Sequence, residues 1–120
     1  MANIKKLIFV YNLNSSPFSQ AIDFFKKKVS PQTFSCNLYK VTHDDFLMKK
    51  EWEEFTKELP IQVKFYHRDM FKKKYPEFDA KFPVVLKEID GQFNVFISTD
   101  EISGTLSLKE LMKIVSEKLS

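Results

Sequence analysis

Apolar residues recur along the first third of the chain in the patterns of a buried strand and an amphipathic helix. The run Leu7–Tyr11 is uninterrupted, which is typical of a strand covered on both faces of a sheet. Ser15–Pro17 offers a helix cap followed by proline, and apolar residues then recur at three-four spacing until about Ser30. The irregular alternation between residues 32 and 43 fits either a short strand or an extended loop.

The middle of the chain predicts a helix, a strand and a short helix. Asp44 or Asp45 supplies a cap, the segment that follows has one apolar face, and Pro60 ends it. Apolar and polar residues then alternate over residues 61–67, as in a strand with one buried face. A short helix capped by Asp69 is expected over residues 69–75.

The last third of the chain contains a predicted β-hairpin. An apolar run from Val84 is followed by Asp90-Gly91, which suits a tight primed turn, and by alternating residues that end near Ile97. Pro83 has no backbone N–H, so we expect it at a strand start, a bulge or a special bend.

A connector and a final helix follow the hairpin. Gly104 lies in the connector of residues 100–106, and Ser107 with Glu110 forms a capping box ahead of an amphipathic segment. A helical crossover makes the two early strands parallel, whereas a two-residue turn makes the last two antiparallel. We therefore predict one α/β domain over residues 1–120, with a four-stranded mixed sheet flanked by helices.

Composition and charge argue for a globular chain that does not bind nucleic acid. Hydrophobic residues make up 43% of the chain and aromatic residues 15%, which excludes a disordered protein. The net charge is only +3, and the single arginine, Arg68, contrasts with the clustered basic residues of nucleic-acid surfaces. The lysine runs at 26–28 and 72–74 are interpreted as solvated helix ends.

The number of cysteines and the hydropathy of the chain indicate the cellular compartment in which the protein is expected. A single cysteine, Cys36, excludes an internal disulfide and fits a reducing environment. The apolar run after Lys5-Lys6 is too short for a signal peptide, and no run approaches membrane-spanning length. We expect a cytoplasmic protein with no membrane partner.

No residue pattern predicts a catalytic or metal centre. Cys36, His43 and His67 carry zinc-ligand atoms, but their spacing matches no ligand motif, and no cofactor is expected. Cys36 fits a small buried hydrophobe, and His67 fits a core histidine on the inward side of a strand. The carboxylate pair Asp44-Asp45 lies at a helix cap, which explains it without acid–base chemistry.

The order of elements, with Phe82-Pro83 directly before a strand and an Asp-Gly turn after it, resembles the thioredoxin-like fold and its glutaredoxin branch. The resemblance extends over the whole chain. It implies a cis peptide bond before Pro83 and places that proline opposite the loop that joins the first strand to the first helix. Members of this group that act as oxidoreductases carry a Cys-x-x-Cys in that loop, where the helix N-terminus lowers the thiol pKa.

The chain departs from this pattern in the residues that would carry out the redox chemistry. The corresponding stretch, residues 12–17, contains no cysteine, so dithiol redox activity does not carry over. The chain is also similar to a group of small bacterial thioredoxin-like proteins with a Cys-x-x-Cys after the first helix, where this sequence has Cys36 and Tyr39. Some members of that group are labelled GTPases, but Gly91 and Gly104 form no phosphate-binding loop, so we reject that function.

The resemblance implies a binding surface where the proline loop faces the first helix. Backbone N–H groups at a helix N-terminus suit an anion or an extended peptide. An ordinary capped helix beside a packed proline loop is the alternative interpretation. The candidate binding residues are Asn12, Asn14, Ser15, Ser16, Phe82 and Pro83.

Three functions follow from these observations. The first is a redox-inactive thioredoxin-like domain that binds a protein, a peptide or a small anionic ligand. The second is an enzyme with one thiol, Cys36, acting as an oxidoreductase or with glutathione. The third is an interaction module that uses the alternating strand of residues 61–67 as an exposed sheet edge.

Overall fold

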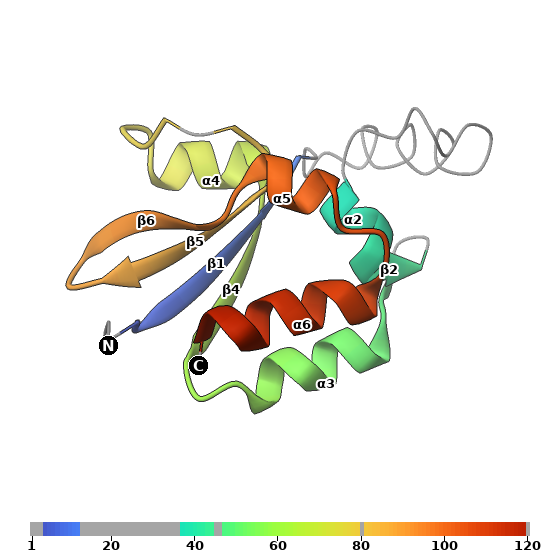
Figure 1. Ribbon diagram of the computed structural model, residues 1–120. Helices are drawn as coiled ribbons and strands as arrows, with labels where there is room; N and C mark the ends of the chain where they lie inside the picture. The colour runs from blue at the N-terminus through green and yellow to red at the C-terminus, as the bar shows by residue number, and fades with distance from the viewer. Residues whose placement is uncertain (1–3, 13–36, 45–46, 80, 120) are drawn as a thin grey trace.

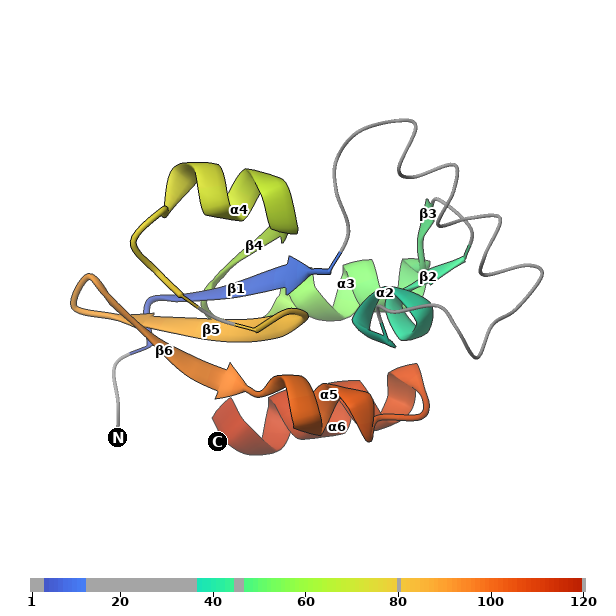
Figure 2. The ribbon, with the colours of Figure 1, turned by 90° about the horizontal axis from the view of Figure 1, so that it is seen from above.

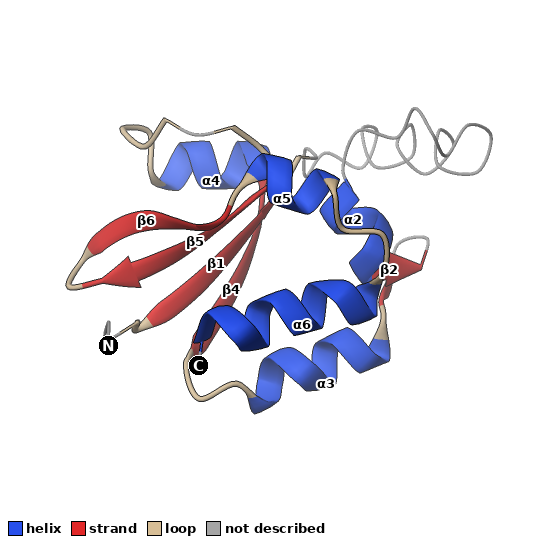
Figure 3. Cartoon of the chain, in the orientation of Figure 1, coloured by secondary structure: helices blue, strands red, loops and turns tan. Residues whose placement is uncertain are grey.

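A four-stranded mixed sheet forms the centre of the computed structural model, which describes residues 4–12, 37–44, 47–79 and 81–119 (Figure 1). The strand order is β4-β1-β5-β6, and helices lie on both faces of the sheet, as Figure 3 shows. The predicted α/β class and the mixed sheet are confirmed. The strands are β1 (Lys6–Tyr11), β4 (Gln62–His67), β5 (Val84–Ile89) and β6 (Gln92–Ile97).

β1 occupies an interior position because its apolar run can be covered on both faces. It pairs in parallel with β4, with Phe9 opposite Phe65, and antiparallel with β5, with Phe9 opposite Val85. The predicted parallel crossover is therefore confirmed. β4 and β6 are the two edges of this sheet.

The β5–β6 hairpin has the predicted primed turn. Asp90 and Gly91 have φ angles of 52° and 80°, which a two-residue primed turn requires at both central positions. The register shifts between Val85 and Leu86, which marks a bulge or irregularity near the start of β5. Pro83 directly precedes β5, and its peptide bond with Phe82 is cis.

Alternating side chains of β1 divide the core into two layers, one on each face of the sheet. Helices cover both faces, as the view in Figure 2 shows. Leu7, Phe9 and Tyr11 join the larger layer, whereas Ile8 and Val10 join the smaller one. The larger layer is covered by α2 (Asn37–Thr42), α3 (Lys50–Glu58), α5 (Thr99–Ser103) and α6 (Leu108–Leu119), and the smaller by α4 (Arg68–Lys74).

The second predicted helix starts later than expected. Two short strands, β2 (His43–Asp44) and β3 (Leu47–Met48), pair with each other, and α3 begins only at Lys50. Its N-cap is Lys49, which makes no side-chain cap hydrogen bond, so the predicted cap at Asp44 or Asp45 was wrong. Similarly, α4 is capped at His67, and Asp69 lies inside its first turn.

Two segments that were not predicted to be helical form helices. Residues 37–42 form α2 rather than a strand or loop, and the Asn37 amide donates hydrogen bonds to the carbonyl oxygens of Ile102 and Thr105. The connector after the hairpin contains α5, which has a complete capping box between Ser98 and Glu101. These hydrogen bonds fix α2 against the end of α5.

The predicted Ser107–Glu110 cap is half confirmed. The Ser107 hydroxyl accepts a hydrogen bond from the Glu110 N–H at 3.2 Å, as expected. The Glu110 carboxylate, however, accepts from the N–H of Leu106 at 2.7 Å rather than from that of Ser107. The helix predicted between residues 15 and 31 lies outside the described residues.

Candidate functional site

The predicted site residues that the structure describes lie at one end of the sheet. Asn12 follows the carboxyl end of β1, and Phe82 and Pro83 precede β5. Because β1 and β5 are antiparallel, the end of one strand meets the start of the other. Asn14, Ser15, Ser16 and Cys36 lie outside the described residues.

A row of three residues crosses the sheet at this end. Tyr11 is opposite His67 of β4, and since Val10 is opposite Val84, the same register brings Tyr11 beside Pro83. Pro83 is buried, and its carbonyl oxygen accepts a hydrogen bond from the Thr99 hydroxyl at 3.0 Å. In open α/β sheets, ligands bind outside the carboxyl ends of strands where the connections diverge, and β1 ends at such a point.

Phe82 turns toward the α4 face of the sheet. Its ring centroid lies 6.0 Å from that of Phe71 on α4, and the Lys72 ammonium lies 5.6 Å from the Phe82 centroid. Tyr11 belongs to the core layer on the opposite face. The two sides of the proline loop therefore have different surroundings. Phe82 lies beside an aromatic ring and a lysine ammonium, whereas Tyr11 lies among the aromatic rings of the larger core layer.

Arg68 is a site residue that sequence reasoning missed. Its Nη1 donates a 2.8 Å hydrogen bond to Oδ1 of Asn12, which joins the start of α4 to the end of β1. Both side chains are half-buried. The only signal in the sequence was that Arg68 is the single arginine and directly follows a predicted strand.

Aromatic and imidazole rings pack beneath this end of the sheet. Tyr39 stacks on His43 with ring centroids 4.2 Å apart and planes 10° apart. Tyr11 lies 5.3 Å from His43 and 6.2 Å from His67, again between centroids. The cluster brings together both histidines of the chain, which lie far apart in sequence.

Hydrogen bonds at His43 determine which ring nitrogen carries a proton. The Thr42 hydroxyl donates its one proton to the carbonyl oxygen of Leu38 at 2.7 Å. That hydroxyl therefore accepts from Nδ1 of His43, 2.8 Å away. His43 is buried with a protonated Nδ1, so the protein holds its ring in one orientation.

His67 has an unusual environment for a histidine. Its Nδ1 is buried and makes no hydrogen bond to the residues that the structure describes. Burial lowers the pKa of His67, and the Asp69 carboxylate opposes this shift only partly. His67 is therefore neutral at pH 7. The expected core histidine is half-buried and lacks the hydrogen bond that a satisfied core residue would make through Nδ1.

The pKa of His67 predicts an acid-sensitive stability. Because its folded pKa is lower than its unfolded pKa, the unfolded chain binds the proton more readily, and stability falls as pH drops below about 6.5. Replacing His67 with phenylalanine should flatten the decline in the free energy of unfolding between pH 7.5 and pH 5. Urea unfolding at several pH values measures this slope, and an unchanged slope in the variant would contradict the assignment.

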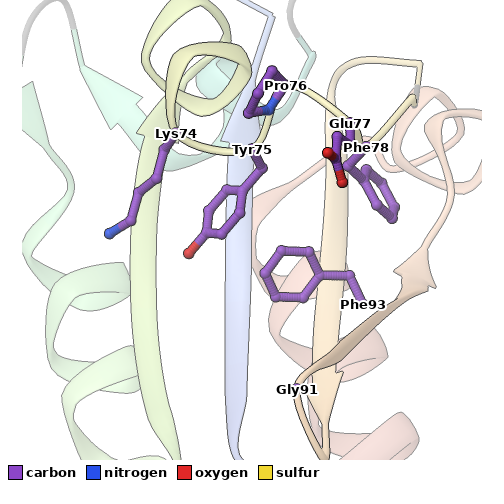
Figure 4. Close-up of a pocket in the computed structure, with 7 residues that line it drawn as sticks. All are labelled: Lys74, Tyr75, Pro76, Glu77, Phe78, Gly91 and Phe93. Carbon is purple, nitrogen blue, oxygen red and sulfur yellow. The ribbon is translucent and has the colours of Figure 1, made fainter.

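A hollow lies on the α4 face, between the end of α4 and the hairpin turn (Figure 4). Its volume is about 470 Å³, and Tyr75, Phe78 and Phe93 are among the residues that line it. The Tyr75 and Phe93 centroids are 4.8 Å apart, with nearly perpendicular planes. The complete lining is Lys74, Tyr75, Pro76, Glu77, Phe78, Gly91 and Phe93.

Lys74 supplies positive charge beside this aromatic hollow. Its Nζ lies 3.1 Å from the Tyr66 hydroxyl and above the rings of Tyr66 and Tyr75. Partial burial raises the pKa of Tyr66, but the hydrogen bond and charge of Lys74 outweigh it and hold that pKa below its ordinary value. The lysine is thus oriented along the edge of β4.

The described residues form neither a metal-binding group nor a membrane-spanning helix. In this part of the chain, no three His, Cys, Asp or Glu side chains gather as a metal-binding group. None of the described helices has the length and apolar character needed to cross a membrane. The groups that remain at the carboxyl end of β1 are a guanidinium, an amide and a neutral imidazole, which are suited to binding an anion.

Comparisons of the chain with known protein families, with curated proteins and with solved structures gave no match.

Proposed function

We propose that the chain is a thioredoxin-like domain without a dithiol site, and that it acts by binding. The proposed fold is supported by the sheet order β4-β1-β5-β6, by the parallel β1–β4 pair and by the antiparallel hairpin. It is also supported by the position of Pro83, directly before β5 and beside the end of β1. Function rests on the site rather than on the fold.

The ligand of this domain carries an anionic group, and it binds at the carboxyl end of β1. The observation that carries this proposal is the 2.8 Å hydrogen bond that holds the Arg68 guanidinium against Asn12. The planar guanidinium of an arginine carries five N–H donors in a fork that matches the geometry of a carboxylate or phosphate. The neutral ring of His67, directly before Arg68, can add an uncharged hydrogen-bonding group without repelling a cationic part of the ligand.

Removing the guanidinium should weaken anion binding. Inorganic phosphate and a short peptide with a free carboxyl terminus serve as probes, and the amidated peptide is the control ligand. We expect Arg68→Gln to raise the dissociation constant of the preferred anion by roughly tenfold or more, since a charge-assisted hydrogen bond is lost. Nitrogen-15 NMR titration measures this constant and should show shifts at Asn12 and Arg68.

The matched control is Lys109→Gln, which removes an exposed cation from α6. This variant should bind as the wild type does. Binding that both variants weaken equally would indicate general charge attraction and contradict a site at Arg68. Robust reduction of insulin in the presence of dithiothreitol would contradict the proposal of a binding domain and favour the single-thiol enzyme that uses Cys36.

A further inference from the structure

Among the strands that the structure describes, β4 lies at one edge of the sheet. Within the described part of the chain, it pairs only with β1. Along a strand, the backbone N–H and C=O groups of alternate residues point to opposite sides, so half of those of Gln62–His67 point away from β1. An extended peptide could pair with these groups and become a fifth strand of the sheet.

An apolar groove follows this open edge on the α3 face. It has a volume of about 330 Å³ and is lined by both apolar side chains and the exposed Glu53–Lys57 ion pair of α3. Val63 and Phe65 are half-buried on this face of β4 and pack against the larger core layer. The lining residues are Met48, Glu53, Thr56, Lys57, Ile61, Val63 and Phe65.

The opposite face of the same edge is cationic. Lys64 alternates with Val63 and Phe65, so it projects to the α4 side, where it is exposed. Tyr66 lies on that side too, and its hydroxyl holds the Lys74 ammonium at 3.1 Å. A strand added to β4 would therefore meet an apolar groove on one face and two lysines on the other.

We propose that the β4 edge binds an extended peptide in which apolar and acidic side chains alternate. The apolar side chains enter the groove beside Val63 and Phe65, and the acidic ones lie next to Lys64 and Lys74. This charge pattern disfavours a second copy of the chain, because pairing two β4 strands would place both Lys64 ammonium groups on the same face. The surface is distinct from the anion site at Arg68, so the two proposals can fail independently.

A fluorescent peptide of alternating valine and glutamate tests this inference with the full chain. A peptide of the same composition in scrambled order is the control ligand, and fluorescence anisotropy measures both dissociation constants. We expect the alternating peptide to bind roughly tenfold or more tightly than the scrambled one. Lys64→Glu should abolish that preference, whereas Lys109→Glu and Arg68→Gln should preserve it. Equal binding of the two peptides would overturn the proposal.

Backbone methylation separates strand pairing from charge attraction. The alternating peptide is made in two N-methylated forms, one methylated at its odd-numbered residues and the other at its even-numbered residues. Only one of the two forms therefore lacks the N–H groups that face β4. One peptide should lose binding and the other should keep it; equal binding of both would overturn pairing with β4. If the chain self-associates and Lys64→Glu strengthens that self-association, the occupant of the β4 edge is instead a second copy of the chain.

Discussion

Replacing Trp52 with alanine should lower the free energy of unfolding by about 3–5 kcal/mol, the range for deleting a large buried aromatic side chain. Trp52 is fully buried on α3, and its ring meets that of Phe9 edge-on at 5.3 Å and stacks on that of Phe55 at 5.6 Å. The substitution removes the ring contact between Trp52 of α3 and Phe9 of β1. Urea unfolding followed by circular dichroism measures the loss, because the variant no longer contains tryptophan.

Two matched variants make this prediction specific. Trp52→Phe should cost less than Trp52→Ala, because it keeps a ring and removes an indole N–H that makes no hydrogen bond to the described residues. Val95→Ala changes a side chain that is 52% exposed and should cost less than about 0.5 kcal/mol. A loss below about 1 kcal/mol for Trp52→Ala would contradict its position at the centre of the larger layer.

Phe71→Ala should have a comparable effect on the other face of the sheet, also about 3–5 kcal/mol. Phe71 is the buried residue of α4, and it touches four aromatic rings at centroid distances of 5.3 to 6.1 Å. Without it, α4 loses its main buried contact, and four rings lose a shared neighbour. Those rings belong to Tyr66, Tyr75, Phe78 and Phe82, of which Tyr75 and Phe78 also line the aromatic hollow.

The control for Phe71 is a change that keeps most of the volume. Phe71→Leu should lose less stability than Phe71→Ala, and Met70→Ala, at a side chain that is 49% exposed, should lose little. Amide hydrogen exchange gives a second readout, since α4 should lose protection in Phe71→Ala before β1 does. Equal loss of protection in α4 and β1 would contradict an anchor local to α4.

The sheet could be predicted from the sequence because its signals are local. The Tyr11 hydroxyl is the only polar side-chain group in Leu7–Tyr11, so an interior position follows from the apolar character of the run. Asp90-Gly91 tolerates the positive φ angles of a primed turn, which fixes the antiparallel pairing of β5 and β6. Neither prediction required knowledge of a distant residue.

The helices were harder to predict because capping signals are shared with other structures. Ser98 and Glu101 have the same spacing as Ser107 and Glu110 and also cap a helix, but that helix, α5, has only 5 residues and therefore little periodicity to predict it. The start of α3 is hard to predict for the opposite reason. Its N-cap residue, Lys49, makes no side-chain cap hydrogen bond, so the sequence carries no capping residue at that position. Asp44 instead belongs to a two-residue strand, β2, which pairs with Leu47–Met48. The apolar residues of that partner strand fit the apolar pattern of the helix that follows, so the sequence does not separate the two.

The candidate site could be predicted only in part, because its contacts join distant segments. The proline loop and Asn12 were expected at one end of the sheet, and the structure brings them there. The bond from Arg68 to Asn12 spans 56 residues of sequence, so no local pattern predicts it. The ring packing of His43 and His67 around Tyr11 likewise depends on the crossover from β1 to β4.

The central position of β1 has a consequence for synthesis of the chain. Lys6 pairs with Gln62 on one side and with Glu88 on the other, so β1 leaves the ribosome long before either partner. Until then, Leu7–Tyr11 is an unpaired segment with high β propensity, no charge and no proline, which is the composition of aggregation-prone sequences. Lys5 and Lys6 precede this run, and their positive charges oppose its association with other chains during synthesis. The strand that is paired on both sides in the folded sheet thus waits without either partner while the rest of the chain is synthesised.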